Sequence, residues 1–198
     1  MLITNTNEFL ITKIFGPEYT TEYTFYYKIT SLISMIVTLA LTPIWSVVTK
    51  AMAEKNFTWL SKLYKIIVIA GVGTCVLQFL LVPCMQFIMN IWLGDDSISV
   101  NYIIAIAFAC FGSVFVYSSM LSTVVCGLAR MKLQVICYGI GIVFKFIFIF
   151  VAARYVNNWS IVVWSNTIIL LPYCIVQQID LNRYFKKQKL LNQTQENE

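Results

Sequence analysis

The sequence predicts an all-α integral membrane protein, a helical bundle of five full transmembrane helices plus a partial N-terminal helix. Of its 198 residues, 59% are hydrophobic and 12% are charged; an ordinary soluble domain has about 25% charged residues. The mean hydropathy is correspondingly high, at +0.77. Runs of about 20 mostly apolar residues, enough for a helix to cross a hydrocarbon core ~30 Å thick, recur along the chain.

The elements follow one another with short connections. Segment 1–15 is too short and too polar to cross a bilayer by itself, and Gly16-Pro17 predicts a turn after it. The connection 49–65 mixes lysines with aromatic residues, which is typical of a helix lying partly in the membrane interface. The five spans are expected at about 23–48, 66–92, 100–125, 133–153 and 160–180.

Lysine and arginine are concentrated in alternate connections. Ten of the fourteen fall in 49–65, in 130–132 and in the C-terminal stretch, and only two fall in the other connections. By the positive-inside rule, the basic connections and the C-terminus are cytoplasmic. We therefore expect 1–187 to form a single transmembrane helical domain, and 188–198 to form a polar cytoplasmic tail that ends in disorder.

The composition argues against several kinds of chemistry. Histidine is absent, which removes the usual general base and the commonest metal ligand. The six cysteines lie inside apolar runs without C-x-x-C spacing, so we expect them to pack as small apolar residues. Asp95-Asp96 is expected to be a solvated turn and not a metal site. We predict a protein that is not an enzyme and has no cofactor, no metal and no nucleic-acid partner; the basic residues favour the membrane surface.

Two lysines lie inside predicted spans. Lys28 is near the outer end of the first span, where snorkelling to water and a ligand-facing position are both open. Lys145 is near the middle of the fourth span, where a cation costs about 3 kcal/mol to insert, so we expect it to face a polar cavity and not lipid. Pairing with a backbone carbonyl is the alternative. Gly141, one turn earlier, would let another helix approach closely.

Other candidate residues are polar, aromatic or helix-bending. Asn7 interrupts the first segment. A tyrosine cluster beside Lys28 is interpreted as an interfacial aromatic belt, with ligand stacking as the alternative; it comprises Tyr23, Tyr26 and Tyr27. Three prolines each remove a backbone donor inside a span and are candidate hinges, with a break expected at the last of them; they are Pro43, Pro83 and Pro172.

Short motifs spread over nearly the whole chain carry a family resemblance. They are KIFGPE at Lys13–Glu18, Tyr27-Lys28, LTPIWS at Leu41–Ser46, IWLGD at Ile91–Asp95 and GLARMKLQ at Gly127–Gln134. In order and spacing these motifs resemble Wzx-type O-antigen and polysaccharide flippases, of the multidrug/oligosaccharidyl-lipid/polysaccharide exporter superfamily. The resemblance implies the C-terminal lobe of such a transporter, with a MATE-like helical fold.

What the resemblance implies is transport for O-antigen and lipopolysaccharide biosynthesis. The substrate would be undecaprenyl-pyrophosphate-linked oligosaccharide, moved across the bacterial cell inner membrane by alternating access. Substrate-binding candidates are Lys28, Lys145, Tyr27 and Asn7, of which the lysines suit the pyrophosphate and Asn7 stands where the family often has aspartate. The expected partners are the bilayer and a missing N-terminal lobe or a second chain.

Other functions stay open from the sequence. The chain could be a non-transporting truncated remnant or a membrane assembly partner. It could also be half of a MATE-like drug exporter, for which Glu8 would be the acidic group. The missing lobe could be encoded in a longer product, encoded separately, or supplied by a second copy of this chain.

Overall fold

The computed structural model describes residues 2–94, 99–155 and 158–196. These residues form helices only, and the predicted all-α bundle is confirmed. Five of the helices are long and apolar enough to cross a membrane, as predicted. The short first helix, with 13 residues, extends only about 20 Å. The helices are α1 (Leu2–Ile14), α2 (Pro17–Ala53), α3 (Phe57–Leu93), α4 (Tyr102–Gly127), α5 (Lys132–Ala152) and α6 (Ser160–Glu196).

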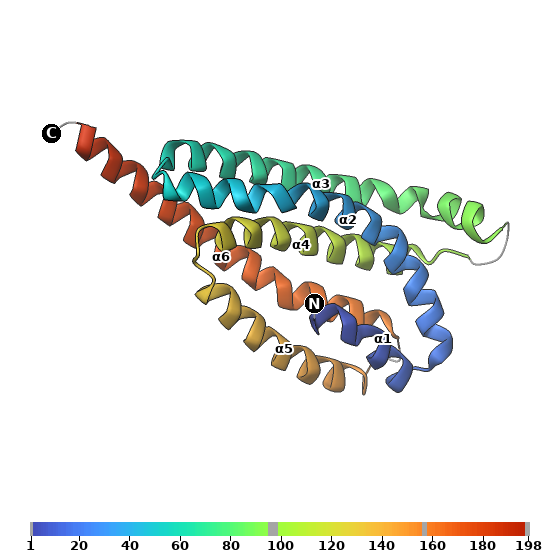
Figure 1. The fold of residues 1–198 in the computed structure, drawn as a ribbon. Helices are drawn as coiled ribbons and strands as arrows, with labels where there is room; N and C mark the ends of the chain where they lie inside the picture. The colour runs from blue at the N-terminus through green and yellow to red at the C-terminus, as the bar shows by residue number, and fades with distance from the viewer. Residues whose placement is uncertain (1, 95–98, 156–157, 197–198) are drawn as a thin grey trace.

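Helix α4 is the centre of the bundle. It packs against α2, α3 and α6, while α5 packs on α6 and the short α1 lies against α2 and α6 (Figure 1). More than half of the most apolar stretch of α4 is buried inside the protein, against about a sixth for α2, α3 and α5. The other faces of those three helices expose large apolar side chains, which suits contact with lipid.

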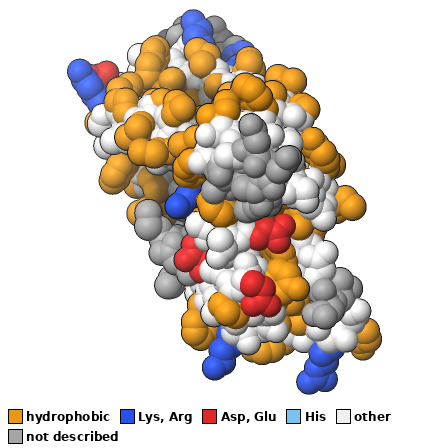
Figure 2. Space-filling model, turned by 90° about the vertical axis from the view of Figure 1, so that its right-hand side faces the viewer, with side chains coloured by type: hydrophobic (Ala, Val, Ile, Leu, Met, Phe, Trp, Pro, Cys, Tyr) orange, Lys and Arg blue, Asp and Glu red, His pale blue; other side chains and the backbone are white. Residues whose placement is uncertain are grey.

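The two ends of the bundle differ in charge. The α2–α3 and α4–α5 connections and the C-terminal part of α6 lie at one end, here called the basic end (Figure 1). The ten Lys and Arg residues assigned to cytoplasmic connections therefore gather there. Figure 2 looks onto the opposite end, where acidic side chains lie among hydrophobic and uncharged ones, with a few Lys and Arg side chains also in view.

Local sequence explains where the helices start and stop. Gly16 has a φ of 123° and Pro17 opens α2, so the predicted turn is confirmed. The Asn56 side chain accepts a hydrogen bond of 3.1 Å from the Trp59 backbone N–H and caps α3. Asn101 caps α4 in the same way by accepting from the Ile103 N–H at 3.0 Å.

Two expectations about helix boundaries are wrong. In the connection 49–65, α2 runs to Ala53 and α3 starts at Phe57, so most of it is helical and its place in the membrane interface stays a prediction. Helix α6 is continuous past Pro172, which removes only one backbone donor. It also continues to Glu196 instead of giving way to a disordered tail, because its basic end is rich in good helix formers. Pro43 and Pro83 likewise lie inside continuous helices, and hinge roles for the three prolines stay predictions.

The expected close helix approach at Gly141 is confirmed. A Cβ atom added to this glycine of α5 would lie 2.5 Å from Cγ2 of Ile169 on α6. Only a residue without a side chain permits that spacing, which is the usual use of small residues between membrane helices.

Candidate functional site between α2 and α4

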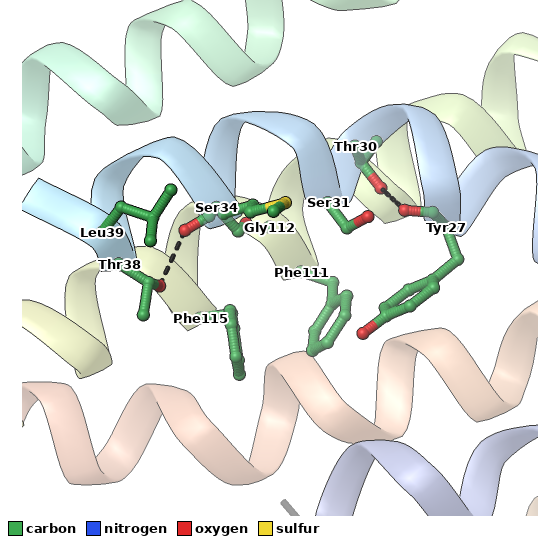
Figure 3. A pocket seen from close by; sticks show the side chains of 10 residues that line it. Tyr27, Thr30, Ser31, Ser34, Thr38, Leu39, Phe111, Gly112 and Phe115 are labelled. Carbon is green, nitrogen blue, oxygen red and sulfur yellow. Dashed lines mark hydrogen bonds between the residues drawn. The ribbon is translucent and has the colours of Figure 1, made fainter.

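A pocket of about 280 Å³ opens between α2 and α4 at the level of the membrane spans. Figure 3 shows hydroxyl groups from α2 on one wall and the rings of Phe111 and Phe115 from α4 on the other. The lining residues are Tyr27, Thr30, Ser31, Ser34, Met35, Thr38, Leu39, Phe111, Gly112 and Phe115.

A second pocket, of about 360 Å³, continues along the same two helices toward the basic end. Thr38 lines both pockets. The other lining residues of the second pocket are Leu41, Thr42, Trp45, Ser119, Ser122, Thr123 and Cys126. We call the two pockets together the hydroxyl groove.

Helical periodicity puts these hydroxyl groups on one face of α2. Ser31, Ser34, Thr38 and Thr42 follow Tyr27 at intervals of three or four residues, the spacing that aligns side chains along one side of a helix. The groove is therefore a property of the α2 sequence, completed by the serines and threonine of α4.

The groove hydroxyls are arranged to accept hydrogen bonds. Ser31 donates to the Lys28 carbonyl at 2.9 Å, and Thr38 donates to the Ser34 carbonyl at 2.7 Å. On α4, Ser119 donates to the Phe115 carbonyl at 3.0 Å. Because the protons of these three hydroxyls are used within their own helices, their oxygen lone pairs are what they offer to a ligand. A ligand rich in O–H or N–H donors fits this surface, and none of the groove residues is charged.

Lys145 lies apart from the groove, in a polar contact with α1. It is 1% exposed, and its Nζ donates to Asn7 Oδ1 at 2.7 Å and to Thr6 Oγ1 at 3.1 Å. Asn7 Nδ2 in turn donates to the Tyr23 hydroxyl at 3.0 Å, so that one network joins α5, α1 and α2. Lys145 is buried away from lipid, as expected, but what it meets is a pair of side chains of α1 and not the expected polar cavity.

The interpretation of the tyrosines as an interfacial belt is wrong for two of the three. Tyr23 and Tyr26 are 2% and 0% exposed and pack against Phe108 and Trp159 in the core. The sequence could not show this, because the buried face of α2 depends on Trp159, at the distant start of α6. Tyr27 stacks on Tyr23 with ring centroids 5.7 Å apart and reaches the groove.

A contact between Trp159 and Glu22 was not predicted from the sequence. The Trp159 Nε1–H donates to Glu22 Oε2 at 3.2 Å and ties the start of α6 to α2. No local sequence signal marks either residue, because the sequence predicts Trp159 to lie in a loop and Glu22 to be an acidic residue at the surface.

The structure does not bring the predicted site residues into one place. Asn7 and Lys145 bond directly, and Tyr27 joins them only through Tyr23. Lys28 is exposed, and its Nζ lies 5.8 Å from the ring centroid of Trp92 on α3. Pro172 lies in a separate apolar pocket between α5 and α6, while Asp95-Asp96 lies outside the described residues.

Comparison with known proteins adds no relative. No protein-family model, no curated protein and no solved structure matches this chain.

Proposed function

We propose that this chain is one lobe of a flippase that carries lipid-linked oligosaccharide across the bacterial inner membrane, with its C-terminus in the cytoplasm. The observation that carries the proposal is the hydroxyl groove, a row of hydrogen-bond acceptors along two helices that are long and apolar enough to cross a membrane. Lipid supplies no hydrogen-bond donor at that depth, so these oxygens can accept hydrogen bonds from a polar ligand that enters the groove.

The substrate chemistry matches this arrangement. An oligosaccharide presents many O–H donors that lose water when they enter the membrane, and each unpaired buried hydroxyl is costly. Groove oxygens replace that water, while the polyprenyl tail stays in the lipid. Met35 and Leu39, which are 62% and 64% exposed at the groove edge, offer the tail an apolar path.

The absence of charge in the groove favours a sugar over a cationic drug. A drug exporter would place an acid against its substrate, whereas Glu8 is exposed and is not among the groove residues. The groove therefore takes the glycan and not the pyrophosphate. Recognition of the pyrophosphate by Lys28 or Lys145 stays a prediction from the sequence.

The groove is half of a site. Pockets of about 280 and 360 Å³ are small for an oligosaccharide, and they are open along α2 and α4. A facing lobe, from a longer product, a second chain or a second copy, would close the other side and permit alternating access.

Filling the groove should abolish glycan binding. Thr38→Phe places a ring where the two pockets meet, whereas Ile36→Phe adds similar bulk to the same helix at a side chain that is 69% exposed. We expect purified Thr38→Phe in nanodiscs to bind undecaprenyl-pyrophosphate-linked oligosaccharide at least tenfold more weakly, about 1.4 kcal/mol. Ile36→Phe should bind it like the unmodified protein.

Removing the hydroxyls without filling the groove tests the contribution of their hydrogen bonds separately from the space that the groove offers. Ser31→Ala, Ser34→Ala and Thr38→Val, combined, delete three acceptors worth roughly 1 kcal/mol each, so binding should fall roughly 100-fold. Equal binding of sugar-free undecaprenyl pyrophosphate by the unmodified protein would overturn the assignment of the groove to the glycan.

A further inference from the structure

A pocket of about 250 Å³ lies at the basic end, between the start of α3 and the C-terminal part of α6. We call it the basic pocket. Neither the hydroxyl groove nor the α1–α5 contact shares a residue with it. Its lining residues are Ser61, Tyr64, Lys65, Asn182, Phe185, Lys186 and Lys189.

Buried contacts fix the shape of the basic pocket. The Tyr64 hydroxyl donates to Asn182 Oδ1 at 3.0 Å and so links the two helices. The Tyr64 ring also stacks on Phe185, with centroids 5.0 Å apart and an angle of 28° between the planes. Both rings are nearly fully buried, so the floor of the pocket is rigid and its polar rim is held in place.

Three lysines from two helices line this pocket, and no acidic side chain lines it. The ion pairs in the described part of the chain are Lys50–Glu54 and Arg130–Asp180, and neither uses a pocket lysine. The positive charge of Lys65, Lys186 and Lys189 is therefore available to an anion.

Exposed aliphatic side chains begin directly on the membrane side of the pocket. Ile69, one turn beyond Lys65 on α3, is 71% exposed. Ile179 and Ile175, one and two turns before Asn182 and on the same face of α6, are 45% and 51% exposed. A molecule whose anionic head occupied the pocket would thus have its hydrocarbon part against apolar side chains.

We propose that the basic pocket binds the phosphate of an anionic phospholipid headgroup, with the acyl chains lying along α3 and α6. Basic pockets between membrane helices on the positively charged side commonly hold such headgroups. The exposed isoleucines on the membrane side of the lysines favour a lipid over a soluble phosphate. The site is independent of transport, since it needs only that the chain lies in a membrane.

Lipid retention by the full chain tests the site. Lys65→Gln/Lys186→Gln/Lys189→Gln should lose phosphatidylglycerol in native mass spectrometry, with affinity reduced roughly 100-fold, about fivefold for each lysine. The matched control is Lys55→Gln/Lys62→Gln/Lys187→Gln, which removes three exposed lysines of the same end outside the pocket and should retain the lipid. If the triple variant does not fold, the single change Lys186→Gln tests the same site, and its affinity for the lipid should fall about fivefold.

Two results would overturn the proposal. Equal loss of lipid in the two triple variants would mean that diffuse surface charge, not a pocket, attracts the lipid. Displacement of phosphatidylglycerol by millimolar inorganic phosphate would mean that the pocket is a soluble-anion site. Phosphatidylcholine, which has no net charge, should be retained no better by the unmodified protein than by either variant.

Discussion

Replacing Asn7 with leucine should destabilise the protein more than replacing Lys145 with methionine, although both changes break the same 2.7 Å hydrogen bond. Asn7→Leu leaves the buried ammonium without its shortest acceptor and removes the donor to the Tyr23 hydroxyl. Removing one partner of a buried cation costs about 3–5 kcal/mol. Lys145→Met removes the cation itself and leaves only neutral groups unpaired, at about 1–3 kcal/mol.

The two changes should also be strongly non-additive. Burying a cation at mid-membrane costs about 3 kcal/mol, so its removal offsets part of what the broken bond costs. The double variant should therefore be about as stable as Lys145→Met alone, as measured by unfolding in detergent. Lys13→Gln, at an exposed residue of α1, serves as the control. Additive losses, or an Asn7→Leu protein as stable as Lys145→Met, would mean that the network does not hold α1 in place.

Gly127→Ala should cost about 1–3 kcal/mol of stability, the usual effect of overpacking a core. Its new Cβ would lie 2.5 Å from Val48 Cγ1 and 2.7 Å from Val48 Cβ. Val48 is buried and β-branched, so it has little freedom to move aside and α4 must separate from α2. The new Cβ would also lie 3.3 Å from the carbonyl oxygen of Trp45, a groove residue, so groove binding should weaken together with stability.

Gly73→Ala is the matched control. Nothing lies within 4 Å of a Cβ added there, in the middle of α3. Alanine is preferred to glycine inside a helix by about 1 kcal/mol, so this variant should be as stable as the unmodified protein or more stable. Equal melting temperatures for Gly127→Ala and Gly73→Ala would contradict the close packing of α4 on α2.

The sequence predicts the number and order of the membrane helices because lipid imposes a minimum length of apolar residues on each span. It predicts the ends of the helices poorly, because the hydrophobic pattern does not mark where a helix ends once the chain has left the hydrocarbon layer. Helix α6 thus continues through Lys186 and Lys189 to Glu196, and this extension supplies one wall of the basic pocket.

The candidate site could be foreseen only in part. Lys145 was expected to face a polar cavity, but its partners are Thr6 and Asn7, 139 and 138 residues away, and no local pattern connects them. The spacing of hydroxyl-bearing residues from Tyr27 to Thr42 already places them on one face of α2. It gave no clear signal because Ser and Thr in membrane helices routinely bond to their own backbone, and Thr24 and Ser46, which do not line the groove, do so as well.

Protection of position 38 by substrate tests the proposed transport role most directly. In a background without native cysteines, Thr38→Cys should react with a membrane-impermeant, hydrophilic maleimide in proteoliposomes, because the groove admits water. Undecaprenyl-pyrophosphate-linked oligosaccharide should slow that reaction, and undecaprenyl pyrophosphate without sugar should not. Labelling at the same rate with and without the oligosaccharide would contradict a glycan site between α2 and α4.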